Sequence, residues 1–130
     1  MIQLCYISTA RPQVQAEAVD GILAQSRRNN RRVGVTGLLL FNGKRFLQVL
    51  EGEPALVEQA YKRIGTDPRH FAIVKLSERT IEKREFDGWN MAYEQLPADA
   101  TREEMLAHVA GLTATASPSV KALFTSYAAM

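Results

Sequence analysis

The chain has 130 residues, which is enough for one domain that buries its own hydrophobic core. Hydrophobic residues make up 46% and charged residues 23%, and this ordinary balance excludes a disordered or fibrous chain. The net charge of +2 does not call for a polyanionic partner, the single Cys5 excludes an internal disulfide, and no apolar stretch could span a bilayer or act as a secretory signal. We therefore expect a cytoplasmic globular protein.

The first part of the chain predicts a strand, a helix and a β-hairpin. Apolar residues alternate over residues 2–8, so this segment is expected to form a strand with Tyr6 on its buried face. The apolar spacing over residues 13–28 is that of an amphipathic helix. Two apolar strands, at 37–41 and 45–50, are joined by an Asn-Gly pair, which is typical of a tight hairpin turn.

The alternation of helices and strands continues. Pro54 lies in the first turn of a predicted helix that ends near Gly65. Residues 71–76 are expected to form a strand, and Trp89 and Met91 alternate on a short final strand. The order βαββαββ predicts an α+β, ferredoxin-like fold, in which a five-stranded mixed sheet carries two helices on one face.

Two more amphipathic helices are predicted at the end of the chain. Thr101 and Glu104 have the spacing of a capping box, and Ser117 precedes a proline that favours the start of a second helix. The apolar sides of these helices need a surface to cover. That surface is either the bare face of the sheet or an interface between two copies. We expect a sheet domain at residues 1–96 and a helical extension at 97–130.

The chain carries little that is typical of enzymes. There is no glycine-rich phosphate loop, and His70 and His108 with one cysteine do not make a zinc site. Ser8 has no histidine close to it in the sequence. Glu51 and Glu53 flank a glycine where a strand leads into a helix, which favours a charge role at the helix N-terminus over acid–base catalysis. We expect no enzymatic activity.

Four arginines lie between Arg27 and Arg32. We interpret them as an exposed helix end whose cations complement the helix dipole. A nucleic-acid-binding module that uses this run is the alternative, although the stacking aromatics typical of RNA recognition are missing there. A small acylphosphatase-like enzyme would share the strand order. It would need an anion-binding loop after the first strand, and residues 8–11 contain no glycine.

Five short motifs follow one another in the first 96 residues of the chain. They are Cys5-Tyr6-Ile7-Ser8, Asn30 followed by Val35-Thr36-Gly37-Leu38-Leu39, Phe46-Leu47-Gln48-Val49-Leu50-Glu51-Gly52, Asp67-Pro68-Arg69-His70, and Phe86-Asp87-Gly88-Trp89-Asn90-Met91. In this order and at these separations, the motifs resemble those of the BLUF family of blue-light photoreceptors.

The resemblance implies a non-covalently bound flavin between the two core helices, usually FAD, with FMN as the alternative. It implies that Tyr6 is the electron donor and that Gln48 lies between Tyr6 and the C4=O and N5 edge of the flavin. Asn30 would anchor the C4=O and N3 side. The other residues that the resemblance places around the flavin are Asn29, Asp67, Arg69, Ser26, Arg63 and His70.

The resemblance also implies a mechanism. Light would move an electron and a proton from Tyr6, leave Gln48 rotated or tautomerised, and shift the flavin absorption slightly to the red. Trp89 and Met91 share one side of the final strand, so we expect them to relay this change to the C-terminal helices. The chain ends soon after those helices. We therefore expect a stand-alone sensor that acts through a partner protein or a change of homo-oligomer.

Overall fold

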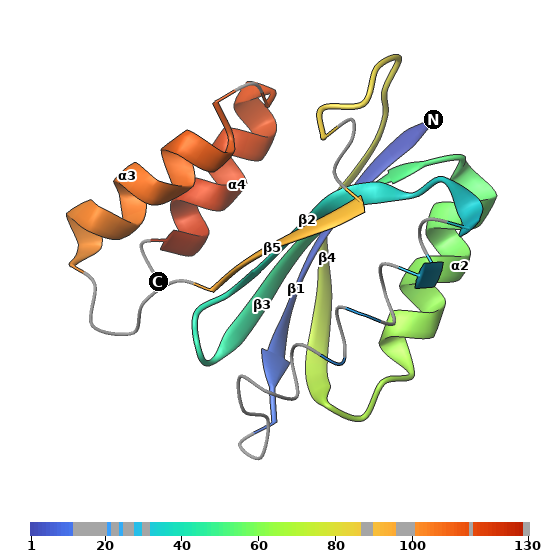
Figure 1. Ribbon diagram of the computed structural model, residues 1–130, viewed down its shortest axis with the longest axis horizontal. Coiled ribbons are helices and arrows are strands. Elements are labelled where there is room, and N and C mark those ends of the chain that lie inside the picture. The colour runs from blue at the N-terminus through green and yellow to red at the C-terminus, as the bar shows by residue number, and fades with distance from the viewer. Residues whose placement is uncertain are drawn as a thin grey trace.

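The computed structural model describes residues 1–11, 21, 24, 28–29, 32–86, 90–95, 101–114 and 116–128, with the backbone alone for 90–95. The fold is α+β, and its sheet has five strands in the order β4-β1-β3-β2-β5 (Figure 1). The elements are β1 (Ile2–Ala10), β2 (Thr36–Phe41), β3 (Arg45–Gly52), α2 (Pro54–Gly65), β4 (His70–Thr80), β5 (Asn90–Gln95), α3 (Arg102–Leu112) and α4 (Pro118–Ala128).

The sheet is mixed, as predicted. β1 runs antiparallel to both β3 and β4, β2 runs antiparallel to β3, and β5 adds to the edge of β2 in parallel. β4 continues to Thr80, beyond the predicted end at Leu76, because the polar residues after Leu76 pair with the start of β1. Hydrogen bonding to a neighbouring strand thus extends an element where the apolar pattern has already stopped.

One face of the sheet packs against α2. Tyr6 and Leu50 point to this face, together with Val57 and Ala60 from the helix. Pro54 occupies the first turn of α2, and Lys62 lies in its last turn, where a cation is favourable. The predicted helix at 13–28 lies outside the described residues, although the isolated positions that are described within it are helical.

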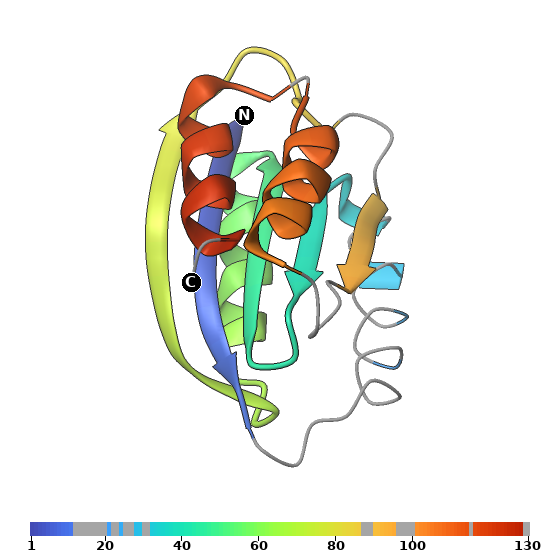
Figure 2. The same cartoon turned by 90° about the vertical axis from the view of Figure 1, so that its left-hand side faces the viewer.

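The opposite face is covered by α3 and α4 (Figure 2). Phe124 of α4 and Val109 of α3 pack with Cys5, Leu38 and other apolar residues of the central strands. Phe124 is completely buried, and a side chain of this size stabilises the fold by about 1.5–3 kcal/mol. The sheet therefore lies between two cores, one on each face.

The predicted starts of the two C-terminal helices are confirmed. The Thr101 hydroxyl accepts a hydrogen bond of 3.1 Å from the backbone N–H of Glu104, and its O–H donates to the Glu104 carboxylate at the same distance. In α4 the Ser117 hydroxyl accepts from the backbone N–H of Val120 at 3.4 Å. No helix in the described part of the chain is long and apolar enough to cross a membrane.

Candidate functional site

Tyr6 and Gln48 form a buried pair on the α2 side of the sheet. They lie directly opposite each other in the β1–β3 ladder, and each side chain is 3% exposed. The Tyr6 hydroxyl donates a hydrogen bond to Oε1 of Gln48. Burial, and then the neighbouring Tyr61 and Asp67, raise the pKa of Tyr6 well above its usual value. Tyr6 is therefore a neutral phenol that holds its proton against the glutamine oxygen.

The surroundings of this pair are mostly apolar. The ring of Tyr61, from α2, lies 5.6 Å from the ring of Tyr6 at an interplanar angle of 52°. Leu39 of β2 lies opposite Gln48 on the other side of β3. The rings of Phe41 and Phe46 stack at 4.5 Å close to the hairpin that joins β2 and β3.

Asp67 and Arg69 form an ion pair in the turn between α2 and β4. Nε of Arg69 donates to both carboxylate oxygens of Asp67, at 2.8 and 3.0 Å, and its backbone N–H donates at 2.9 Å. The hydrogen bonds from Arg69 hold the pKa of Asp67 below its usual value. The carboxylate fixes the guanidinium in one orientation at the end of the α2 face.

His70 links β1 to the C-terminal end of α2. Its Nε2 lies 2.7 Å from the carbonyl oxygen of Ile64, which can only accept, so Nε2 donates the hydrogen bond. Its Nδ1 lies 2.7 Å from the Ser8 hydroxyl. The fold thus brings a histidine to Ser8 that the sequence did not show. The ring is oriented by a carbonyl instead of a carboxylate and Ser8 is buried, so the pair does not form a catalytic triad.

The structure places some of the other predicted site residues and leaves the rest outside the described part. Asn29 is half-buried, and Arg63 is exposed on the last turn of α2. Met91 lies on β5, where the side chains are not described. Three of the predicted site residues lie outside the described residues: Ser26, Asn30 and Trp89.

The basic run is described only at two positions. Arg28 and Arg32 are exposed, as expected for a solvated helix end, whereas Arg27 and Arg31 lie outside the described residues. Among the residues that the structure describes, no group of histidine, cysteine and carboxylate side chains could hold a metal ion.

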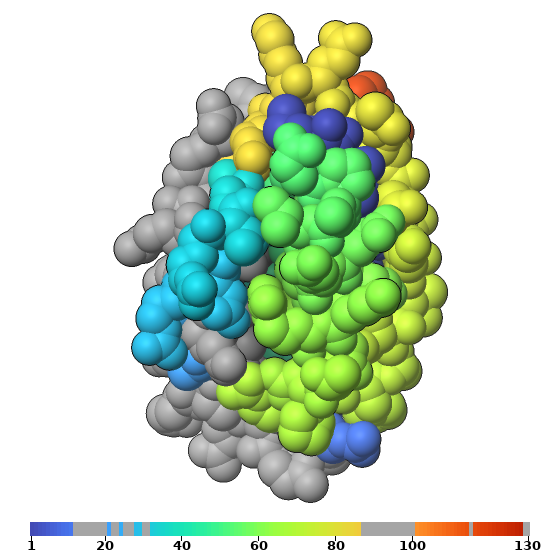
Figure 3. Space-filling view, turned by 90° about the vertical axis from the view of Figure 1, so that its right-hand side faces the viewer, coloured from blue at the N-terminus to red at the C-terminus, as the bar shows by residue number. Residues whose placement is uncertain are grey.

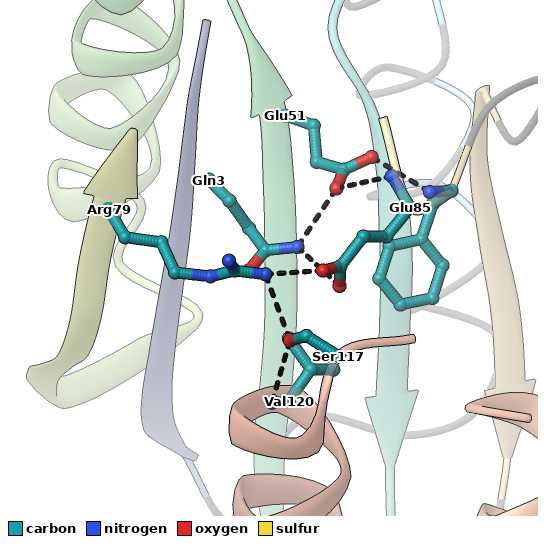
Figure 4. Close-up of polar contacts among 7 residues, drawn as sticks. Gln3, Glu51, Arg79, Glu85, Ser117 and Val120 are labelled. Atoms are coloured by element: carbon teal, nitrogen blue, oxygen red, sulfur yellow. Dashed lines mark hydrogen bonds and ion pairs between the residues drawn. The ribbon is translucent and has the colours of Figure 1, made fainter. Parts of the chain in front are cut away.

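The interpretation of Glu51 as a charge at the start of α2 is wrong. Glu51 lies on β3, and its completely buried side chain points to the face of the sheet that α3 and α4 cover, away from α2. Its carboxylate accepts hydrogen bonds from the backbone N–H groups of Glu85 and Phe86 and from the Gln3 amide (Figure 4). Sequence alone could not identify these partners, since they become neighbours only when the sheet forms.

Comparisons with known proteins agree with this arrangement. The profile of the family described as "BLUF: Sensors of blue-light using FAD" matches residues 1–92, which include the Tyr6–Gln48 pair and the Asp67–Arg69 turn. The chain belongs to the BLUF family. Members of this family sense blue light with FAD.

Three relatives illustrate the range of the family. The "Blue light- and temperature-regulated antirepressor BluF" of Escherichia coli is 40% identical over 73 residues, 56% of this chain. The "Photoactivated adenylate cyclase subunit beta" of Euglena longa is 31% identical over 105 residues, 80% of this chain. The chain spans only 18% and 11% of the length of these two relatives. The dark-state structure of BlrB, a BLUF protein, superposes with a TM-score of 0.75 at 30% identity and covers 98% of this chain and 95% of that one.

The residues of the site fit a flavin. A flavin ring needs apolar contacts for its flat faces and hydrogen-bond partners along its polar edge. The α2 face offers both, because the Tyr6–Gln48 pair lies among apolar side chains, and Arg69 is held by Asp67, whose charge acts on Tyr6. Figure 3 shows this side of the molecule, with α2 in green beside residues 32–36 in cyan.

Proposed function

We propose that this chain is a blue-light sensor in which Tyr6 and Gln48 form the photochemical switch. The observation that supports the proposal most strongly is the hydrogen bond between the Tyr6 hydroxyl and Oε1 of Gln48, buried on the α2 face. A primary amide has a donor and an acceptor end of nearly the same shape. Gln48 can therefore exchange the two without a change in packing.

FAD, when bound, would supply the absorption of light and the oxidant for an electron that leaves Tyr6. Tyr6 then loses its hydroxyl proton together with the electron, because burial disfavours a charged side chain at this position. The proton moves along the existing hydrogen bond to Gln48. When Tyr6 recovers its electron and proton, Gln48 remains rotated or tautomerised. Its hydrogen-bond donor then points where its acceptor was before.

Other residues would hold the cofactor. Arg69, oriented by Asp67, would bind near the polar side of the ring and the start of the ribityl chain, and Asn29 and Asn30 would hold the edge that carries C4=O and N3. His70 would contribute ring contacts only, since Ser8 and Ile64 occupy both its nitrogens. Ser26 and Arg63 complete the proposed set.

The output of the switch is also a proposal. We assign residues 1–96 to the sensor and 97–130 to a helical extension that carries the signal, with Trp89 and Met91 as the relay through β5. The signal would reach a partner protein or a second copy of this chain. Large apolar side chains exposed on the edge strand β4, at Phe71, Val74 and Leu76, support such an interaction.

The experiment that tests the proposal is spectroscopic. The purified chain should be yellow, should release FAD on denaturation, and should show a small red shift under blue light that decays in the dark. Chromatography of the released flavin distinguishes FAD from FMN. A colourless chain that is retained on nucleic acid in a salt-dependent manner would overturn the proposal and favour the nucleic-acid-binding alternative.

A further inference from the structure

A polar cluster with a buried centre, formed by Gln3 and Glu51, lies on the face of the sheet opposite to Gln48. We call it the Gln3 junction, and it consists of Gln3, Glu51, Arg79, Glu85 and Ser117. Figure 4 shows these side chains converging from β1, β3, β4, the segment before β5, and the start of α4. The junction connects five parts of the chain that are far apart in the sequence.

The amide of Gln3 is at the centre of the junction. Its Nε2 donates to the carboxylates of Glu51 and Glu85, both at 2.9 Å, and its Oε1 accepts from Nε of Arg79 at 2.9 Å. If the amide turned over, its oxygen would face two carboxylates and its N–H groups would face a guanidinium. One orientation of Gln3 is therefore strongly preferred, in contrast to the exchange proposed for Gln48.

Two ends of the junction hold segments that lead away from the sheet. Glu51 accepts from the backbone N–H groups of Glu85 and Phe86, at 2.9 and 2.8 Å, just before the segment that leads to β5. The guanidinium of Arg79 pairs with Glu85 and donates to the Ser117 hydroxyl at 2.9 Å. Ser117 is the residue that caps α4.

Cations lie beside the two carboxylates of the junction. Two carboxylates, Glu51 and Glu85, lie with the guanidinium of Arg79, and Arg84 adds a second guanidinium that donates to the Glu51 backbone carbonyl at 2.9 Å. Burial raises the pKa of Glu85, but hydrogen bonds from Gln3, the Ser117 backbone and Arg79 outweigh it and lower the pKa overall. Gln3 and Glu51 are completely buried and both are hydrogen-bonded, so the centre of the junction is held in one arrangement and its members are expected to move together.

The junction and the proposed switch share the same two strands. Tyr6 pairs with Gln48 and Gln3 pairs with Glu51 in one continuous β1–β3 ladder, on opposite faces of the sheet. A change in the position of β3 at Gln48 therefore also changes the position of Glu51. This change would displace the backbone N–H groups of Glu85 and Phe86, which are hydrogen-bonded to Glu51. It would also displace the Gln3 amide, which is hydrogen-bonded to Arg79, and Arg79 in turn donates to Ser117.

We propose that the Gln3 junction is a positioning device that fastens the start of α4 to the strands of the switch, and that it carries the light signal from Gln48 to α4. This proposal rests on the proposed function and adds a second route to the relay through β5. Glu51 and Gln3 are positioning residues in it. They act through the backbone at 85–86 and through Ser117.

The test uses hydrogen exchange of the flavin-loaded chain of 130 residues, in the dark and under blue light. Ser117→Ala removes the contact between the junction and α4. Thr101→Ala is the matched control, because it removes the same kind of helix cap from α3 without touching the junction. Each substitution should speed exchange in the first turn of its own helix by about fivefold.

The light response should distinguish the two variants. In Ser117→Ala, the flavin red shift and the light-induced change in exchange at Glu85 and Phe86 should persist, whereas the light-induced change at Val120 and Lys121 should be lost. In Thr101→Ala, all three responses should match the wild type. Arg79→Gln should reproduce the result of Ser117→Ala while leaving the α4 cap in place.

Two results would overturn the proposal. One is a wild-type light response at Val120 in both Ser117→Ala and Arg79→Gln, which would leave β5 as the route. The other is a wild-type chain whose red shift is normal but whose exchange at Glu85 and Phe86 does not change with light. If the wild type showed no red shift at all, the proposed function would fail, and the light-driven part of the junction's role would fail with it.

Discussion

Gln48 and Glu51 both lie on β3, but Gln48 points to the α2 face and Glu51 points to the face covered by α3 and α4. The alternation of side chains along a strand produces this arrangement. One short strand therefore carries both the amide of the proposed switch and a carboxylate that binds the backbone at Glu85 and Phe86 and the side chain of Gln3. A movement of the strand would therefore shift side chains on both faces of the sheet.

We predict that Tyr6→Phe retains FAD and loses the reversible red shift. The phenylalanine ring fills the same space, and only the hydroxyl that donates to Gln48 is removed. Tyr61→Phe is the matched control, since its ring lies 5.6 Å away on α2. It should bind FAD and keep the shift. Difference absorption spectra measure both variants, and a normal shift in Tyr6→Phe would exclude Tyr6 as the donor.

Gln48→Leu should also bind FAD without the normal shift, and it should lower the free energy of unfolding. The substitution leaves the buried Tyr6 hydroxyl without this acceptor, which costs about 1–3 kcal/mol. In the double variant Tyr6→Phe/Gln48→Leu, both partners are apolar, so part of this loss should be recovered. Urea unfolding of the four proteins measures the coupling between the two side chains. Additive losses would contradict a direct interaction.

The sequence predicted one face of the sheet better than the other. Alternation along the first strand predicted that Tyr6 is buried, and the structure confirms this. The family resemblance implied that Gln48 lies beside Tyr6, and the two residues are partners in the β1–β3 ladder. The strand that contains Glu51 was expected to end at Leu50, two residues too early, since β3 continues to Gly52. Its partners come from β1 and from the segment before β5, and their convergence depends on the register of the sheet.

The pairing of His70 with Ser8 shows the same limit. Nothing near Ser8 in the sequence indicates a histidine partner. The two residues meet because β4 runs antiparallel to β1 and its first residue lies beside the last residue of β1. Periodicity predicts which face a residue occupies, but contacts between distant segments follow from the strand order.

Arg69→Gln should weaken FAD binding by about tenfold, the loss expected for one charged hydrogen bond. Asp67 already holds this guanidinium in a fixed orientation, so little side-chain entropy is lost when the cofactor binds. Lys62→Gln is the control, because Lys62 is exposed in the last turn of α2 and is not among the residues proposed to hold the cofactor. Its affinity should stay close to that of the wild type. Titration of the apoprotein followed by flavin fluorescence gives both dissociation constants. An equal loss of FAD affinity in the two variants would contradict a specific role for Arg69.

The stability of the chain should fall at alkaline pH. Burial raises the pKa of the Cys5 thiol from 9.0 to about 12, and it also raises that of Tyr6 above 10.0. Both groups stay protonated in the folded chain and ionise first in the unfolded chain. Their contribution is therefore complete below about pH 9 and is lost as the pH rises towards the folded pKa values. Each group should contribute up to about 1.4 kcal/mol per pH unit in that range.

Urea unfolding at about pH 8 and about pH 10 measures this slope. Cys5→Ala is the control, since it removes one of the two groups and should make the loss of stability less steep. A thiol reagent should react with Cys5 only when the chain unfolds, because the residue is completely buried. Rapid labelling of the folded chain near neutral pH would contradict the buried, protonated thiol.

Gly37→Ala and Gly111→Ala should change stability in opposite directions. A Cβ at Gly37 would lie 1.9 Å from the carbonyl oxygen of Val49, a backbone atom of β3 that cannot move without disturbing the ladder. We expect a loss of more than about 2 kcal/mol. A Cβ at Gly111 meets no atom within 4 Å, and alanine favours the helix by up to about 1 kcal/mol.

The Gly37→Ala substitution should also disturb the proposed Tyr6–Gln48 switch, because the Val49 carbonyl that it displaces belongs to the residue next to Gln48. Gly37→Ala that still binds FAD should therefore show an altered dark spectrum, while Gly111→Ala should keep the wild-type spectrum with a higher unfolding midpoint. A Gly37→Ala protein with wild-type stability and spectrum would contradict the close approach of β2 to β3. Urea unfolding and absorption spectra of the same samples decide between these outcomes.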